Sequence, residues 1–160
     1  MRAVCAAVLA AACAHALDRS PPSFAAGVSV SIAPQTVVND PVLADRGAEL
    51  RAALARAFAA EGFSVVPGGG RLVALTSIDY TPWTGLTAAS LYVVVKLASD
   101  GIAIDQAEVQ RINEGFPEPA GVPGLARALA HELATSPRLA TFLRPTPGES
   151  PPSRPPDPPR

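Results

Sequence analysis

Two alternating segments of apolar and polar residues flank an Asp-Gly pair in the middle of the chain. Before the pair, every second residue is a large aliphatic one: Leu91, Val93, Val95 and Leu97. β-Branched residues resume directly after it, at Ile102 and Ile104. An Asp-Gly pair between two such segments is the strongest short-range signal of a β-hairpin. We therefore expect Asp100 and Gly101 to form its two-residue turn.

The turn also fixes a register for the hairpin. Leu97 then lies opposite Ile104, and Lys96 lies opposite Asp105. Two apolar residues and two opposite charges are thereby paired across the strands, and both pairs favour this arrangement.

Further along the hairpin the same register conflicts with the apolar pattern. It sets Val93 against Glu108, which a regular ladder does not favour. A β-bulge near Asp105-Gln106 would move Ala107 and Val109 to the apolar face and remove the conflict. We expect such a bulge in the second strand of a hairpin that spans Ser90 to Arg111.

Three other segments have the pattern of strands. In Gly27–Ala33 aliphatic residues alternate with serines. In Leu72–Tyr80 successive residues are assigned to opposite faces over the whole segment, with Leu72, Ala74, Thr76, Ile78 and Tyr80 on one of them. Phe63–Val66 is a short apolar segment that ends at Pro67. Gly68 to Gly70 separate the last two segments, and we expect a flexible turn there.

A helix is predicted from about Val42 to Glu61. Asp40 is a suitable N-cap, Pro41 suits the first helical position, and Gly62 can end the helix in the left-handed conformation. Its apolar residues recur at helical spacing, at Leu43, Leu50, Leu54 and Phe58.

A second helix is predicted from about Pro123, where leucines recur at four-residue spacing at Leu125, Leu129 and Leu133. Ser136-Pro137 resembles another cap and first turn. We expect the folded chain to end near Arg144.

The predicted order is strand, helix, short strand, three longer antiparallel strands, helix. Strands and helices do not alternate strictly, which favours an α+β fold. We expect a mostly antiparallel sheet of about four to five strands with two helices packed on one face.

The two ends of the chain differ from the middle. Residues 1–12 have a positive start and a short apolar run, as in a secretory signal, and are too short to span a bilayer. Residues 13–23 are short, polar and Pro-containing, and we interpret them as a tether to a domain over residues 24–144. Residues 145–160 are half proline, and we expect an extended tail; a spacer and a ligand for a polyproline-binding groove are the alternatives.

Two cleavage sites compete in the signal segment. Ala14-His15-Ala16 fits the small-x-small rule and would give a soluble chain that begins at Leu17. The segment from Leu9 to Cys13 resembles the lipobox of bacterial lipoproteins, whose cysteine is lipidated at the new N-terminus. Ala10 stands where the family pattern prefers a larger aliphatic residue. We favour the lipoprotein interpretation, with several acyl chains on Cys13 holding the protein to a membrane.

Composition excludes several kinds of site. The net charge is −1 and no Lys/Arg cluster alternates with aromatic residues, so we expect no nucleic-acid partner. The only cysteines are Cys5 and Cys13, so the folded part has neither a disulfide framework nor a cysteine metal site. We expect no cofactor and no metal.

Catalytic patterns are incomplete. The sequence that starts at His131-Glu132 begins like the helix motif of zinc proteases, but Thr135 occupies the position of the second histidine. We therefore expect His131 to be a solvated residue on the helix surface. An enzyme built from the dispersed carboxylates of Asp79, Asp105 and Glu108 remains an alternative hypothesis. No catalytic residue is assigned.

Trp83 is the only tryptophan, and it lies in a loop between two predicted strands, close to Pro82 and Gly85. Such a residue can anchor a protein partner or enter a membrane interface. The alternative is that its indole folds back over the sheet edge. Trp83 is our candidate for partner binding.

The layout from Cys13 to Leu143, with a lipobox-like start, a tether and a strand-helix-strands-helix body, resembles small bacterial envelope lipoproteins. The families it resembles are the LPS-assembly lipoprotein and the auxiliary lipoproteins of ABC-type envelope transporters. The resemblance implies a non-enzymatic protein on the periplasmic face of the outer membrane. It also implies an envelope protein or lipid system as the partner.

Overall fold

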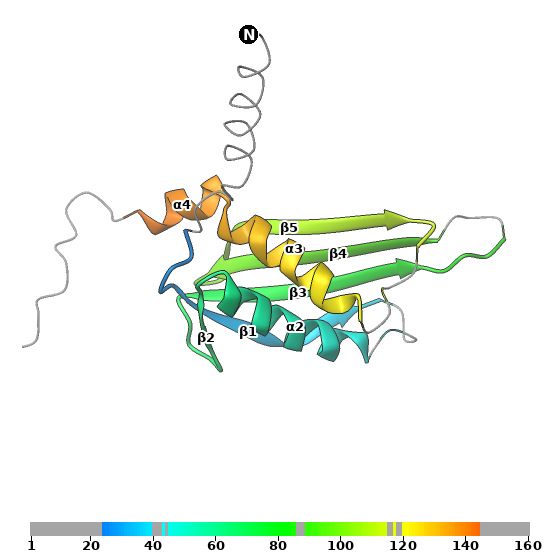
Figure 1. Cartoon of the computed structure of the whole chain (residues 1–160), viewed down its shortest axis with the longest axis horizontal. Helices are drawn as coiled ribbons and strands as arrows, with labels where there is room; N and C mark the ends of the chain where they lie inside the picture. Colours follow the sequence, from blue (N-terminus) through cyan, green and yellow to red (C-terminus); the bar gives the residue numbers. More distant parts are fainter. Residues whose placement is uncertain are drawn as a thin grey trace, which may run out of the picture.

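A five-stranded sheet forms the centre of the computed structural model, which describes residues 24–39, 43, 45–85, 89–114, 117 and 120–144 (Figure 1). The strands lie in the order β2-β1-β3-β4-β5. Their bounds are β1 Ser29–Val38, β2 Ser64–Val66, β3 Leu72–Thr81, β4 Ser90–Ser99 and β5 Ile102–Ile112. The helices of the described residues are α2 Arg46–Ala60, α3 Val122–Ala134 and α4 Pro137–Leu143.

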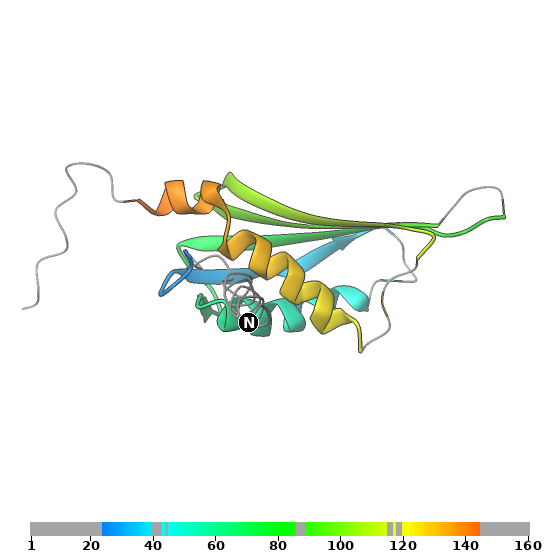
Figure 2. The same ribbon diagram turned by 45° about the horizontal axis from the view of Figure 1, so that its top comes forward.

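The predicted α+β class is confirmed. β4 is antiparallel to both of its neighbours, whereas β1 is parallel to both β2 and β3. Most of the paired residues lie in the antiparallel ladders, and α2 and α3 cover the same face of the sheet (Figure 2). The short α4 follows the predicted cap at Ser136, whose side chain accepts a hydrogen bond from the backbone N–H of Arg138.

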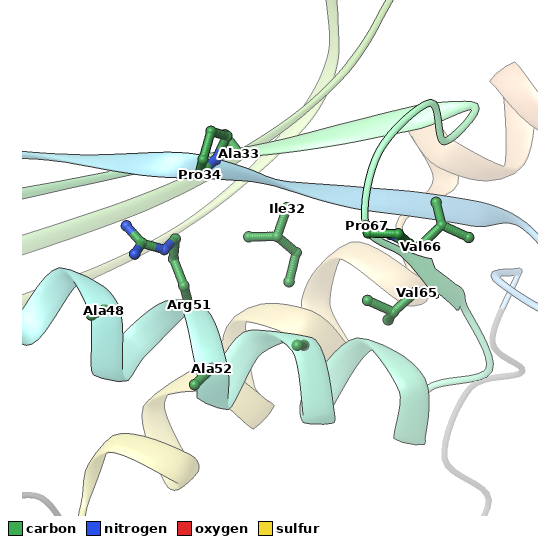
Figure 3. A pocket seen from close by; sticks show the side chains of 10 residues that line it. Ile32, Ala33, Pro34, Ala48, Arg51, Ala52, Val65, Val66 and Pro67 are labelled. Carbon is green, nitrogen blue, oxygen red and sulfur yellow. The ribbon is translucent and has the colours of Figure 1, made fainter.

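The chain crosses β1 on its way from β2 to β3, because these two strands lie on opposite sides of β1. Figure 3 shows this crossing segment, which begins at Pro67, passing the blue strand. The crossing is held at its end by two serines of β1. The Arg71 N–H donates to Ser29 Oγ over 2.9 Å, and the Ser31 hydroxyl is 3.4 Å from the carbonyl oxygen of Leu72.

The turn of the β4–β5 hairpin is confirmed, but its predicted register is wrong. Asp100 and Gly101 have φ values of 51° and 79°, as a two-residue turn of this kind requires. Two residue pairs next to the turn keep the predicted register, and the register then shifts between Ala98 and Leu97. Leu97 therefore faces Asp105 rather than Ile104. The bulge therefore comes earlier than predicted, before Asp105 instead of after it.

This earlier bulge has two consequences for the pairing. Lys96 lies opposite Gln106, so the predicted charge pair with Asp105 does not form. Val93 faces Val109 and Val95 faces Ala107, as the apolar pattern requires. The bulge removes the conflict for which it was predicted, although it lies at a different residue.

The first helix is shorter than predicted. α2 begins at Arg46 after Asp45, which occupies the N-cap position without a side-chain hydrogen bond. The predicted start signals at Asp40 and Pro41 lie outside the described residues. Gly62 has a φ of 97°, so the predicted left-handed stop is confirmed.

The core lies between the sheet and the two long helices. The predicted apolar positions of the helices are buried except Leu43, which lies before α2 and is only partly buried. The rings of Phe58 and Phe63 meet edge to face with centroids 5.0 Å apart. Burial of each large aliphatic side chain contributes about 1.5–3 kcal/mol before chain entropy is subtracted. The largest buried residues of this core are Leu50, Leu54, Phe58, Leu72, Ile78, Leu91, Leu97, Leu129 and Leu133.

Both outer edges of the sheet are irregular. β2 pairs with only the first three residues of β1, and beyond them β1 contains Pro34 and a register shift between Ile32 and Thr36. β5, at the other edge, carries the bulge before Asp105. Within the described residues, the bulge limits the regular part of the β5 edge to Asp105–Ile112, and β2 covers the start of β1 at the other edge.

The two ends of the described body lie at the same end of the sheet (Figures 1 and 2). The Phe24 N–H donates to the carbonyl oxygen of Ala134 over 2.8 Å, which ties the start of the body to the end of α3. The chain continues from there through α4 to its C-cap, Arg144. The connection that follows β3 projects from the opposite end of the sheet.

Candidate functional site

Trp83 lies in that projecting connection, two residues beyond the end of β3. Its side chain is 72% exposed, which is the largest exposed fraction among the large hydrophobic residues of the described part. The indole therefore does not fold back over the sheet edge, and that interpretation is wrong. An exposed indole is available for contact with another molecule.

Cys13 lies outside the described residues, as do the rest of the tether through Ser23 and the proline-rich tail of residues 145–160. Lipid attachment at Cys13 therefore stays a prediction from the sequence. The structure does locate the point from which the tether departs, because the Phe24 N–H donates a hydrogen bond to the carbonyl oxygen of Ala134, the last residue of α3.

The sheet face opposite α2 and α3 is covered by no helix or strand of the described residues (Figure 2). Three large hydrophobic residues on it are exposed, Val37 by 64%, Leu75 by 46% and Tyr92 by 36%. A shallow recess of about 360 Å³ crosses this face; its lining includes Val37, Ser77, Asp79, Tyr92 and Lys96. We refer to this face of the sheet as the open face.

A hydrogen bond between Tyr92 and Glu108 joins two strands on the open face, with the phenolic O–H donating to the carboxylate. This hydrogen bond raises the pKa of Tyr92, and partial burial and the negative charge of Glu108 raise it further. Tyr92 is therefore a neutral donor under ordinary conditions and does not serve as a base.

The three carboxylates considered for an enzyme do not form one site. Asp79 pairs with Tyr92, and Glu108 pairs with Val94, so both lie on the open face. Asp105 faces Leu97 on the side of the sheet that the helices cover. The sheet itself separates Asp105 from the other two residues.

An apolar groove runs between α2 and the edge of the sheet (Figure 3). Its volume is about 400 Å³, and it is lined chiefly by small or aliphatic residues, among them Ile32, Pro34, Ala52, Val65 and Pro67. Arg51 rises from α2 towards β1 at one side of the groove (Figure 3). Among the described residues that line the groove, Arg51 is the only one with a polar side chain.

His131 is not the isolated, solvated residue that the sequence suggested. Its Nδ1 lies 3.1 Å from Glu61 Oε1, and the pair joins the last turn of α3 to the end of α2. The two side chains are 44% and 23% exposed. The zinc motif remains incomplete, and the Thr135 hydroxyl donates to the carbonyl oxygen of His131.

A second recess lies where β5 meets the corner between α3 and α4, and it has a volume of about 560 Å³. It contains a buried carboxylate, Asp105, that is only 8% exposed. Asp105 Oδ1 accepts a hydrogen bond from the Gln106 N–H over 2.9 Å, whereas Oδ2 has no partner among the described residues. The sequence did not indicate this site, because Asp105 is buried only as a result of the displaced bulge.

Two further features are absent from the described residues. No three His, Cys, Asp or Glu residues there are arranged to hold a metal ion. No helix of that part of the chain has the length and apolar character needed to cross a membrane.

Comparison with known proteins assigns the chain to no family. No family model matches it, and no curated protein is similar in sequence. Solved structures with a related layout include the PelC dodecamer from Paraburkholderia phytofirmans, at 19% identity and a TM-score of 0.42, covering 73% of this chain and 93% of that one. Lipoprotein GNA1162 from Neisseria meningitidis has 13% identity and a TM-score of 0.43 over 68% and 99% of the two chains. Protein XCC0632 from Xanthomonas campestris, of family DUF330, has 14% identity and a TM-score of 0.36 over 78% and 91%.

Proposed function

We propose that this chain is a lipid-anchored protein on the periplasmic face of the bacterial outer membrane. In this proposal Cys13 carries the lipid, and the folded body docks a protein partner of an envelope assembly or transport system. The protein performs no catalysis of its own. The observation on which the proposal depends is the lipobox-like segment from Leu9 to Cys13.

A lipid anchor at Cys13 has the necessary strength. Each buried CH₂ group contributes about 0.8 kcal/mol, so several acyl chains on one cysteine hold a protein stably to a bilayer. The tether from Cys13 to Ser23 spans at most about 40 Å when fully extended. The end of the body that carries Phe24 is therefore held within that distance of the membrane.

The position of Trp83 favours a protein partner over the anchoring membrane. β3 has ten residues, and a strand of that length extends over about 33 Å. Trp83 follows its far end, whereas Phe24 lies at the near end (Figure 1). A body whose Phe24 end faces the leaflet presents the exposed indole away from it, where an aromatic residue is well suited to the centre of a protein interface.

The anchor is tested by replacing Cys13 with Ser and fractionating the cells. We expect the protein to move from the membrane fraction to the soluble fraction or to remain unprocessed. Cys5→Ser is the matched control, because it changes the other cysteine of the signal segment and leaves the lipobox intact. Membrane retention of a Cys13→Ser chain whose signal segment has been cleaved contradicts the anchor.

The mature N-terminus separates the proposal from its alternative. Mass spectrometry should show a chain that begins at a modified Cys13. A free chain that begins at Leu17 would instead establish cleavage after Ala16, and the protein would be a soluble periplasmic or secreted binding domain.

The docking role is tested with a photo-crosslinking amino acid in place of Trp83 in intact cells. The same amino acid at Ile102, which is 68% exposed and follows the hairpin turn at the other end of the sheet, is the control. We expect a discrete protein adduct from position 83 and none of the same size from position 102. Identical adducts from both positions, or none from position 83, contradict the proposed docking end.

The non-enzymatic character is tested by a hydrolase screen of the purified protein. We expect no turnover above that of a heat-denatured sample. An activity that is lost in Asp79→Asn or Glu108→Gln would overturn this part of the proposal, because both carboxylates lie on the accessible open face.

A further inference from the structure

The recess beside Asp105 lies at the end of the body from which the tether departs. Its lining consists of Asp105, Gln106, Glu132, Thr135, Ser136, Pro137 and Arg138, from β5 and the α3–α4 corner. The carbonyl oxygen that holds the Phe24 N–H belongs to Ala134, directly between two of these lining residues. If Cys13 is anchored, the tether brings this recess within reach of the headgroups of the leaflet.

Asp105 is a buried carboxylate with a hydrogen-bond donor for only one of its two oxygens. Its side chain is 6% exposed, and its one hydrogen bond comes from the backbone N–H of the next residue, Gln106. Oδ2 has no partner among the described residues. A buried acceptor in this state is costly, and a cationic N–H donor is the group that would satisfy it best.

Arg138 supplies a positive charge beside this carboxylate without neutralising it fully. Its Nη1 lies 4.0 Å from Asp105 Oδ1, which is longer than a hydrogen bond, and its side chain is 77% exposed. The guanidinium can therefore turn towards an anion at little cost. A guanidinium suits phosphate in particular, because it donates two parallel hydrogen bonds.

We infer that this recess binds a phosphoethanolamine headgroup, with the ammonium at Asp105 and the phosphate at Arg138. Two carbons separate the ammonium from the phosphate ester in this group, so both charges fit two neighbouring side chains of opposite sign. Glu132 and Ser136 also line the recess, and they add a negative charge and a hydroxyl group to it. The assignment to a membrane headgroup rests on the proposed function, which places this end at the leaflet.

The inferred chemistry implies selectivity among headgroups. A choline headgroup carries the same phosphate, but its quaternary nitrogen has no N–H to donate to Asp105. A glycerol headgroup carries the phosphate without any cation. Ethanolamine should therefore bind better than either, by about tenfold or more, since a hydrogen bond to a charged group has a free energy of that order.

Calorimetric titration of the purified mature protein with soluble glycerophosphodiesters is the direct test. We expect glycerophosphoethanolamine to bind at least about tenfold more tightly than glycerophosphocholine or glycerophosphoglycerol. Asp105→Asn should abolish this preference, and Arg138→Gln should weaken all three by about fivefold or more. Arg127→Gln, at an exposed arginine of α3 outside the recess, should leave all three unchanged.

Equal affinity for the three compounds, or a preference that survives in Asp105→Asn, overturns the inference. Arg138 is so exposed that its replacement should leave the fold intact, and circular dichroism verifies this for both variants. A second experiment measures amide hydrogen exchange of the protein on two kinds of vesicle. One contains phosphatidylethanolamine and phosphatidylglycerol, and the other contains phosphatidylcholine and phosphatidylglycerol. Protection of β5 and α4 only with ethanolamine lipid supports a membrane source, and headgroup binding in solution without it points to a free ligand.

Failure of the inference and failure of the proposed function remain distinguishable. The titration reports on the recess whether or not Cys13 carries lipid. The fractionation of Cys13→Ser reports on the anchor whether or not the recess binds a headgroup.

Discussion

The crossing of β1 by the segment between β2 and β3 depends on a glycine with no room for a side chain. A Cβ atom at Gly70 would lie 2.7 Å from the backbone N of Ser31, 2.9 Å from the carbonyl carbon of Val30 and 3.0 Å from the carbonyl oxygen of Leu72. All three are backbone atoms of paired strands, so no side-chain rotation can relieve the contact. Gly70→Ala must therefore displace either the crossing segment or the start of β1.

The neighbouring glycines provide matched controls. A Cβ at Gly68 would meet nothing within 4 Å, and that residue has no positive φ. Gly69 also has open space, but its φ of 68° lies in the left-handed region. The same Gly→Ala change thus tests steric contact at Gly70 and backbone strain at Gly69, and it tests neither at Gly68.

The expected losses of unfolding free energy differ accordingly. Overpacking against rigid backbone costs about 1–3 kcal/mol, and loss of the nearby bond from the Arg71 N–H to Ser29 Oγ adds about 1 kcal/mol. We therefore expect Gly70→Ala to lose about 2–4 kcal/mol. Gly69→Ala should lose about 1 kcal/mol, and Gly68→Ala should be neutral or slightly stabilising, because alanine restricts the unfolded chain.

Urea denaturation followed by far-ultraviolet circular dichroism measures these differences in the chain from Leu17 onward. Tryptophan fluorescence is a poor signal here, because Trp83 is already 72% exposed in the folded protein. The result that would refute the reasoning is a Gly70→Ala variant as stable as Gly68→Ala. It would show that the crossing segment does not press on β1 as the structure has it.

Three further predictions concern the core, a helix cap and the open face. Leu129→Ala should lose about 2–5 kcal/mol in the same urea experiment, whereas Leu75→Ala, at a residue that is 46% exposed, should lose much less; equal losses would contradict the assignment of the two faces. Ser136→Ala should cost about 1 kcal/mol and speed amide exchange within α4 more than in α3, and unchanged exchange would mean that the cap is dispensable. In a spectrophotometric titration Tyr92 should ionise above its ordinary pKa of 10.0, and Glu108→Gln should lower that midpoint. Because the folded pKa is raised, the stability that this bond gives is complete below the unfolded pKa and disappears as the pH rises through the folded value, so no effect is expected near neutrality.

Local signals were sufficient for most elements of the fold. The Asp100-Gly101 turn, the two leucine-rich helical faces and the cap at Ser136 depend on residues close together in the sequence, and the structure confirms each of them. Their conformations follow from backbone preferences and from the burial of one face.

The features that were predicted wrongly or incompletely depend on pairing between strands that are far apart in the sequence. The hairpin bulge lies before Asp105 because the whole sheet, and not the turn alone, selects the register. β1 was predicted to end at Ala33, where Pro34 interrupts the alternation, but the ladder to β3 resumes at Thr36 and continues to Val38. Nothing local to β1 indicates that both of its neighbours are parallel to it.

The candidate sites also divide into features that the local sequence predicts and features that depend on distant parts of the chain. The residue type of Trp83 identified it as a binding candidate, but its exposure depends on the direction in which the loop leaves the sheet. The burial of Asp105 depends on a one-residue shift of the bulge, and its proximity to Arg138 depends on how α4 packs on β5. Cys13 lies outside the described residues, and its role is argued from the sequence alone.

The irregular edges of the sheet matter most for a molecule held on a surface. Confinement to a leaflet brings identical copies together far more often than free diffusion does, and strands with open edges then tend to zip into ribbons. Pro34 interrupts one border of this sheet and the bulge before Asp105 interrupts the other. If Cys13 anchors the protein as proposed, these interruptions shorten the backbone along which crowded copies can pair, and they disfavour ribbons of joined sheets.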